Sequence, residues 1–337
     1  MVKMSVKEET LTISRKQKKV YTLPELLYVS PSPHVRRLDT VSSIMFDVIL
    51  ALIPTLLAGI YFFGSRALII VLIAVAASVI SEAVYQLISH KPVRITDLSS
   101  VVTGLMLGLM MPSGVSLWVP VVGAVFAIIV VKQFFGGIGK NIVNPAIAAR
   151  VFLMLCWPQE MIKYANKAGE LVSSATPLVQ LKAGTTPAVS IFNLVTGNTV
   201  GAIGEVSAIT ISAGFIYLLF RRVVSWRIPL TFIGTVALTS VLFPITGETS
   251  ATVYQLLSGS LIFCALFSAN DPTTTPVTRG GQLIFGVGCG IITIIIRYFG
   301  AYPEGCAYAI LLMNLLVPLF ESWTRPHKFG GKNEKKQ

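Results

Sequence analysis

Residues 42–88 read SSIMFDVILALIPTLLAGIYFFGSRALIIVLIAVAASVISEAVYQLI, and apolar side chains fill almost the whole stretch. The stretch divides into two runs, one near 42–64 and one near 67–88, each of which is about as long as the roughly 20 apolar residues that a helix needs to cross a bilayer. Only Ser65 and Arg66 separate them. The stretch therefore predicts two membrane-spanning helices in succession.

The composition of the whole chain agrees with a membrane protein. Of its 337 residues, 53% are apolar and only 12% are charged, and the mean hydropathy is +0.74. Soluble domains of ordinary composition do not reach this balance. We therefore expect an all-α integral membrane protein.

Further apolar runs raise the expected number of spans to about ten. We place these spans near 42–64, 67–88, 98–112, 115–131, 140–157, 203–220, 228–245, 251–268, 281–299 and 304–323. The runs at 98–112, 115–131 and 140–157 are short or interrupted by Gly, Pro and Asn, which predicts broken or half-helices packed inside the protein. The expected domains are a cytoplasmic segment at 1–41, one transmembrane domain at 42–323 and a cytoplasmic tail at 324–337.

The basic residues predict the orientation, because short loops that carry Lys and Arg stay in the cytoplasm. With the N-terminus in the cytoplasm, most basic residues, Lys132 among them, fall on the cytoplasmic side. The residues that fall outside are Arg66, Lys163, Lys167, Lys182 and Arg297. Both termini are then cytoplasmic, and the net charge of +12 follows from topology, so no nucleic-acid partner is expected.

The spans divide evenly around a long connection. Five predicted spans precede the loop at 158–202, which is expected outside, and five follow it. An odd number of spans in each half gives the halves opposite orientations across the membrane. Weak echoes, such as Thr103-Gly104 and Ser258-Gly259, agree with a repeat. We therefore expect two inverted five-helix repeats, with cofactor or ion sites between them.

Ionisable side chains interrupt several of the apolar runs. Asp47, Glu82, Arg150 and Glu205 lie where hydropathy predicts hydrocarbon. Each would cost roughly 2.5–3.5 kcal/mol or more at the bilayer centre unless it were paired or hydrated. Two interpretations stay open: an ion or proton pathway with Arg150 as counter-charge, or structural ion pairs near helix ends.

Two polar strings also break the apolar sequence, FGGIGKNIVNPA at 135–146 and ANDPTTTP at 269–276. Their backbone must be satisfied by a ligand, by a water-filled cavity or by another helix at membrane depth. Neither a catalytic triad nor an HExxH pair nor a Walker loop occurs, and the four cysteines lack the spacing of metal sites. The residues alone therefore leave a transporter, a channel and a membrane redox subunit as alternatives.

A set of short motifs occurs in a specific order along nearly the whole chain. The motifs are Ser30-Pro31-Ser32-Pro33-His34, Asp97 with Thr103-Gly104-Leu105, the string at 136–146, Gly204-Glu205-Val206-Ser207, Asp271-Pro272 and Tyr302-Pro303-Glu304-Gly305 with Met313-Asn314. Together they resemble the D subunits of Rnf complexes, which are homologous to the B subunit of the sodium-pumping NADH:quinone oxidoreductase. The short N-terminal segment is more similar to the Rnf member. The fold implied by the resemblance is similar to that of urea transporters.

The resemblance implies a covalent flavin. The family attaches FMN through its phosphate to the threonine that ends a Ser-Gly-Ala-Thr type sequence, and Ser173-Ser174-Ala175-Thr176 is similar to it, with Ser174 in place of Gly. Thr176 is therefore the expected attachment site, and a flavin transferase is the expected maturation partner. The orientation inferred from charge places Thr176 outside. There, the resemblance implies, a neighbouring G subunit that also carries FMN reaches it.

The resemblance further implies an activity. The chain would relay electrons between ferredoxin and NAD within a prokaryotic cell membrane and would couple this to Na⁺ or H⁺ translocation, as one member of a complex with the A, B, C, E and G subunits. A second, non-covalent flavin, riboflavin in the relatives, is expected near Asn141 and Asn144.

The candidates for the ion pathway are Asp47, Glu82, Glu205 and Asp271. The alternatives are a redox-free channel or secondary transporter of the same architecture and a subunit of the quinone-reducing complex.

Overall fold

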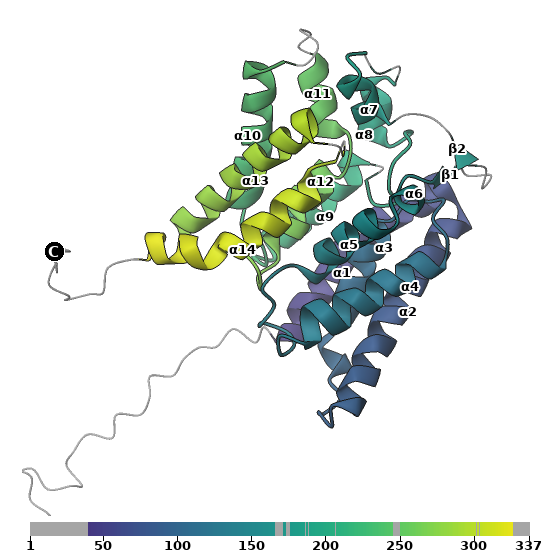
Figure 1. Ribbon diagram of the computed structural model, residues 1–337, viewed down its shortest axis with the longest axis vertical. Coiled ribbons are helices and arrows are strands. Elements are labelled where there is room, and N and C mark those ends of the chain that lie inside the picture. Colours follow the sequence, from purple (N-terminus) through teal and green to yellow (C-terminus); the bar gives the residue numbers. More distant parts are fainter. Residues whose placement is uncertain are drawn as a thin grey trace, which may run out of the picture. The chain divides into compact units, whose positions relative to one another are not determined.

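Long apolar helices form the frame of the computed structural model (Figure 1). The structure describes residues 40–165, 171–172, 176–185, 187, 189–205, 207–244, 250–300, 302 and 304–325, and the elements below all belong to one unit that begins at Val41. Within these residues, the helices long and apolar enough to cross a bilayer by themselves are α1 (Val41–Phe63), α2 (Ser65–Ile88), α13 (Arg279–Phe299) and α14 (Cys306–Thr324). The chain is therefore a mostly helical, multi-pass membrane protein.

Shorter apolar helices lie between these long ones. They are α3 (Ser99–Leu109), α4 (Trp118–Val125) with its continuation as the π-helix Phe126–Gln133, α5 (Pro145–Cys156), α9 (Ala208–Phe220) and α10 (Arg227–Leu242). A bent segment follows α10. It holds α11 (Ser250–Leu257), α12 (Leu261–Leu266) and a 3-10 turn (Ser268–Asn270), with a bend of 57° between α11 and α12. If the two helices are counted as a single span, they form a further crossing of the membrane.

Small elements fill the remaining connections. They are the 3-10 turn Ile95–Asp97, α6 (Pro158–Met161), β1 (Tyr164–Ala165), β2 (Leu171–Val172), α7 (Pro177–Lys182) and α8 (Ile191–Thr196). The two strands pair antiparallel, with Tyr164 opposite Val172. The long loop expected at 158–202 therefore contains several short pieces of regular structure.

The number of complete spans was not confirmed. Helix occurs within every predicted span, but in the described residues only four helices, or five with the bent pair, have the length and hydropathy of a full crossing. The expected half-helices are short: α3 has 11 residues, all buried except Val101, and α5 has 12. The glycines of the string at 135–146 explain one break, because Gly136, Gly137 and Gly139 have positive φ angles that end a helix.

Glycines bring two pairs of helices unusually close together. A Cβ atom added at Gly104 of α3 would lie 2.6 Å from the Cα of Val75 in α2. One added at Gly290 of α13 would lie 2.6 Å from the Cβ of Thr235 in α10. Small residues at such crossings are typical of helix packing in membranes, because they let backbones approach.

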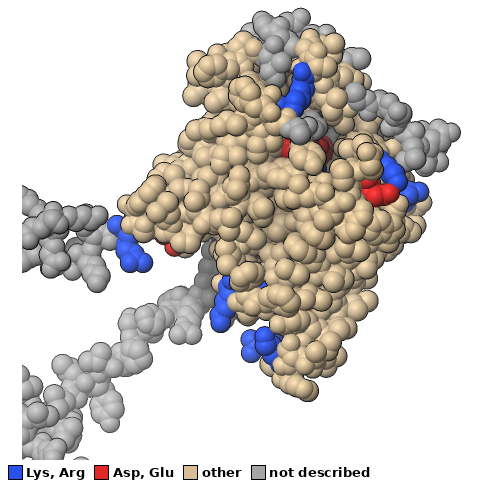
Figure 2. All heavy atoms as spheres, in the orientation of Figure 1, with Lys and Arg blue, Asp and Glu red and all other residues tan. Residues whose placement is uncertain are grey.

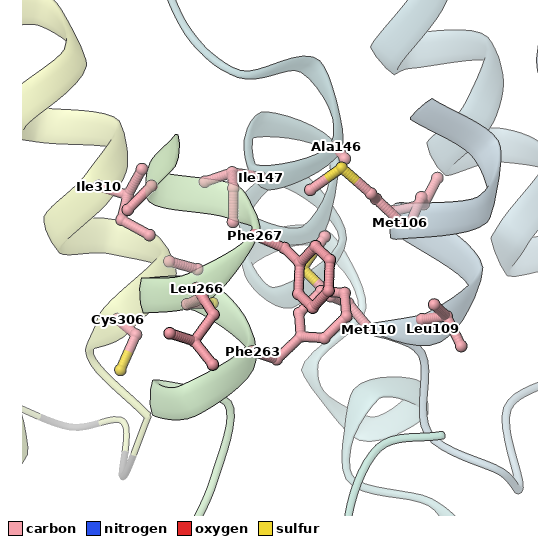
Figure 3. Packing of buried hydrophobic residues seen from close by; sticks show 14 of the residues in the cluster. Met106, Leu109, Met110, Ala146, Ile147, Phe263, Leu266, Phe267, Cys306 and Ile310 are labelled. Carbon is pink, nitrogen blue, oxygen red and sulfur yellow. The ribbon is translucent and has the colours of Figure 1, made fainter. Parts of the chain in front are cut away.

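Helices from the two halves of the chain share one core (Figure 3). Met106 of α3 and Met110 just after it lie beside Phe263 of α12 and Phe267 just after that helix, and all four side chains are buried. The rings of Phe263 and Phe267 are 5.6 Å apart between centroids. Residues distant in sequence are therefore held in fixed positions around this core.

The outer surface is consistent with a bilayer. Figure 2 shows one face on which Lys, Arg, Asp and Glu occur at only a few places. Large apolar side chains, such as Phe46, Leu57 and Tyr61 of α1, are more than half exposed. Large exposed apolar areas of this kind mark contact with lipid or with partner proteins.

Candidate functional site

Thr176 lies directly before α7, at a partly buried position. Its backbone carbonyl accepts a hydrogen bond from the N–H of Val179 at 2.9 Å, but its side chain does not cap the helix. Thr176 lines a hollow together with Glu205 and Glu304. The rest of the expected flavin motif, Ser173, Ser174 and Ala175, lies outside the described residues.

One arginine contacts both carboxylates that line this hollow. Arg150 of α5 places its Nη2 atom 3.1 Å from Oε1 of Glu205 and in contact with Oε2 of Glu304. Its Nη1 atom donates a hydrogen bond to the carbonyl of Met110 at 2.8 Å. The side chains of Arg150 and Glu205 are both 4% exposed, so water screens this ion pair little. The expectation that Arg150 is the counter-charge of a buried acid agrees with this geometry.

Glu304 is a member of this cluster that sequence reasoning missed. It precedes α14, and Ser260 Oγ donates a hydrogen bond to its Oε2 atom at 3.3 Å. The sequence offered a signal for it in the motif Tyr302-Pro303-Glu304-Gly305, at the start of the predicted span 304–323, but gave this glutamate no role in a site. Only the packing of α5 against α14 brings it to Arg150.

Glu82 of α2 belongs to a second buried cluster. Lys132 Nζ lies 2.8 Å from Glu82 Oε1 and donates a hydrogen bond to Ser99 Oγ at 2.6 Å. Gln133 Nε2 donates to Glu82 Oε1 at 2.7 Å. Lys132, which was expected on the cytoplasmic side just after a span, lies in the π-helix that continues to Gln133, and both side chains are buried. π-Helices are rare and occur frequently at functional sites.

Arg297 of α13 is a second buried basic residue. It was expected on the outside, near the end of the span at 281–299, and it is 2% exposed. Its Nη1 atom donates to Oε1 of Gln255 at 2.9 Å, and Nη2 donates to the carbonyl of Ser258 at 3.4 Å. The end of α11 therefore supplies oxygens that compensate the buried guanidinium.

The last two acidic candidates also have partners. Asp47 of α1 accepts hydrogen bonds from Tyr217 Oη at 2.9 Å and from Arg221 Nε at 3.0 Å, both in or next to α9. Asp271 accepts from the N–H of Thr273 at 3.3 Å and from its hydroxyl at 3.0 Å. Asp47 therefore joins two helices, and Asp271 stabilises its own turn.

The two polar strings line one cavity of about 70 Å³. Asn141, Asn144, Lys132 and Asp271 all line this cavity. Asn144 caps α5, because its Oδ1 atom accepts a hydrogen bond from the N–H of Ala146 at 3.0 Å. The Oδ1 atom of Asn141 is buried and has no donor.

The arrangement therefore separates the sequence candidates into groups. Thr176 and Glu205 share one hollow, while Asn141, Asn144 and Asp271 share the other cavity. Glu82 lines a polar cleft of about 270 Å³ together with Asp97 and Gln133. No group of three His, Cys, Asp or Glu that could hold a metal ion occurs in the part of the chain that the structure describes, and all four cysteines are free thiols.

Fold and site together define a class: a polytopic helical membrane protein that buries charged clusters and polar cavities between its helices. Residues 28–330 match the family model described as the NQR2, RnfD, RnfE family, and the chain belongs to this family. The family expected from the motifs is thereby confirmed.

Named relatives align with nearly the full length of the chain. Over 315 residues it is 44% identical to the D subunit of the Na(+)-translocating ferredoxin:NAD(+) oxidoreductase complex of Acetobacterium woodii, covering 92% of this chain and 98% of the relative. It is 37% identical to the D subunit of the proton-translocating ferredoxin:NAD(+) oxidoreductase complex of Clostridium ljungdahlii, covering 90% and 96%. A third relative, the D subunit of the ion-translocating oxidoreductase complex of Halorhodospira halophila, is 32% identical, with 88% and 94% covered.

Proposed function

We propose that the chain is the D subunit of an Rnf-type complex and relays electrons between ferredoxin and NAD while ions cross the membrane. The relatives from Acetobacterium woodii and Clostridium ljungdahlii carry names that state ferredoxin, NAD(+) and an ion. Its partners would be the A, B, C, E and G subunits of the complex. The two relatives name different ions, so Na⁺ and H⁺ are both candidates here.

The electron relay would depend on FMN attached to Thr176. The observation that carries this proposal is the position of Thr176, whose partly buried side chain precedes α7 without capping it and lines a hollow. A phosphoester to its hydroxyl would therefore break no capping hydrogen bond of α7. The bound FMN would supply the redox chemistry, while this chain would hold it and set the charges around it.

The first test of covalent attachment is ultraviolet-excited fluorescence of the chain in a denaturing gel, after expression with a flavin transferase. We expect a fluorescent band in the wild type and in Thr185→Val, and no band in Thr176→Val. Thr185 is the matched control because its hydroxyl is exposed in the same segment and donates to the carbonyl of Gln180 at 2.9 Å. A wild-type chain without a band would contradict the relay and favour a redox-free transporter.

A second, non-covalent flavin would bind at the cavity between the polar strings. Asn141 supports this proposal, because its buried Oδ1 atom lacks a donor that a ligand N–H or O–H could provide. Asn144 would act indirectly, since its amide is used in capping α5. The amount of flavin that acid releases from the purified complex should be lower in Asn141→Ala than in the wild type. The fluorescent band of the covalent flavin should be unchanged. Unchanged release would refute a ligand contact at Asn141.

The number, symmetry and orientation of the membrane spans are also part of this proposal. We propose ten spans in two inverted five-helix repeats, one before and one after the loop at 158–202, with both termini in the cytoplasm. Asp47, Glu82, Glu205 and Asp271 stay the candidates for the ion pathway. Single cysteines placed in α7 and next to α10 would test the sidedness through their labelling by an impermeant reagent in intact cells.

A further inference from the structure

The two carboxylates that line the hollow beside Thr176 depend on the same positive charge. Glu205 and Glu304 both contact a single nitrogen atom, Nη2 of Arg150, so two carboxylates share one guanidinium. The three residues come from α5, from the loop before α9 and from the loop before α14. Their assembly therefore depends on the tertiary fold.

One oxygen of this cluster depends on a nitrogen that a second carboxylate also uses. Glu205 Oε2 accepts from the N–H of Ala202 at 3.3 Å, while Oε1 has only the ion pair with Arg150 Nη2 at 3.1 Å. The same Nη2 atom contacts Glu304 Oε2. The Glu205 side chain is 4% exposed and lines the hollow, so water does little to stabilise this second negative charge.

Neighbouring groups do not supply the missing positive charge by contact. Arg297 directs its guanidinium to oxygens of Gln255 and Ser258. The other titratable side chains that act on the cluster are uncharged at neutral pH, and they are Tyr164 of β1, Cys264 of α12 and Cys306 and Tyr308 of α14. One negative charge of the pair therefore lacks a contacting counter-charge.

The other buried acids differ from this pair. Glu82 forms an ion pair with the ammonium group of Lys132, and Asp47 forms one with the guanidinium of Arg221. Asp271 accepts its hydrogen bonds within its own turn. Two carboxylates at a single guanidinium distinguish Glu205 and Glu304 from all three.

We propose that Glu205 and Glu304 bind one proton between them when the flavin on Thr176 is reduced, a proposal that rests on the function inferred above. A flavin held at Thr176 would gain one negative charge on reduction, in a region where two carboxylates already share one guanidinium. One proton from water then forms an O–H bond to Glu205 Oε1 and is shared with Glu304, so the net charge is unchanged. When the electron leaves, the O–H bond breaks and the proton returns to water.

A proton fits this position better than a metal cation. Two carboxylates that share a site commonly hold one proton between them, because like charges at close range cannot both stay ionised. A sodium ion would have to lie next to the Arg150 guanidinium, which already contacts an oxygen of each carboxylate and would repel it. The proton also relieves the competition of the two carboxylates for one nitrogen, Nη2 of Arg150.

The test is the infrared difference spectrum between the reduced and oxidised complex, with glutamate carboxyl carbons labelled with ¹³C. We expect reduction to produce the C=O band of a protonated glutamic acid in the wild type, shifted by the label. The band should be lost in Glu205→Gln and in Glu304→Gln. It should persist in the control Glu160→Gln, because Glu160 pairs with Lys163 and does not line the hollow.

The same samples separate failure of this proposal from failure of the proposed function. A wild type without the covalent fluorescent band would refute the flavin relay itself. A wild type that carries the flavin but forms no labelled carboxyl band would overturn the proton pair alone, and this result needs no variant to fold. A shift of the labelled carboxylate bands that requires Na⁺ and does not depend on pH would show that the pair binds sodium instead. That result would also overturn the proposal.

Discussion

Substitution of Lys132 by methionine should strongly destabilise the protein. The Lys132 and Glu82 side chains are each 2% exposed and lie 2.8 Å apart, so loss of the ammonium leaves Glu82 charged and buried. Gln133 and Gln86 still donate to Glu82 Oε1, at 2.7 and 3.3 Å, but they bring no charge. Removing one partner of a buried pair costs about 3–5 kcal/mol. We therefore expect Lys132→Met to lower the free energy of unfolding by about that amount.

The double variant Glu82→Gln with Lys132→Met provides the control for this prediction. A neutral pair of similar volume removes the uncompensated charge, so most of the stability should return. The assay is reversible unfolding in mixed micelles with increasing dodecyl sulfate, followed by tryptophan fluorescence. A loss below about 1 kcal/mol in the single variant would refute the argument, because exposed pairs have that magnitude.

Three further predictions concern packing, capping and pH. Gly104→Leu should separate α2 from α3 and lower the unfolding midpoint in the same assay, because a Cβ there would lie 2.6 Å from Val75 Cα, whereas an unchanged midpoint would contradict this packing. Asn144→Ala should cost about 1 kcal/mol through loss of the α5 cap, and Asn144→Ser should recover part of it; equal stability of both variants would argue against capping. The hydrogen bond from Lys163 lowers the pKa of Glu160, so the stability that this group contributes is present above its unfolded pKa and is lost as pH falls through the lowered value. Glu160→Gln should therefore make stability less dependent on acid pH, and an identical pH profile for the wild type and the variant would contradict the pairing.

The sequence predicted the helices well because the bilayer imposes a strong and local rule. Apolar runs near 42–64 and 67–88 became α1 and α2, and the glycines at 136–139 ended a helix as expected. The complete number of spans could not be obtained in this way. Half-helices such as α3 are stabilised by neighbours and not by their own length.

Two buried basic residues show why charge alone does not locate a side chain. Lys132 and Arg297 stand at the ends of apolar runs, where the charge rule predicts a side of the membrane and says nothing of burial. Both are buried because oxygens from distant segments compensate them: Glu82 for Lys132, and Gln255 and Ser258 for Arg297. Such pairings depend on tertiary packing, which no local pattern encodes.

The candidate site was predicted in its parts but not in its arrangement. Thr176, Arg150 and Glu205 were each identified from motifs or from charge in apolar sequence. Thr176 and Glu205 line one hollow with Glu304, and Arg150 contacts both glutamates, so the cluster joins segments that are up to 154 residues apart in the chain. Helix packing around the shared core creates this arrangement.

The central claim, a flavin carried by Thr176, is tested most directly by mass spectrometry of one peptide. Cleavage after Lys167 and Lys182 releases residues 168–182, in which Ser173, Ser174 and Thr176 are the hydroxyl side chains. From chain expressed with a flavin transferase, we expect this peptide to carry the mass of FMN less one water, with fragments that assign it to Thr176. A peptide without the added mass, or with the mass on a serine, would contradict the claim.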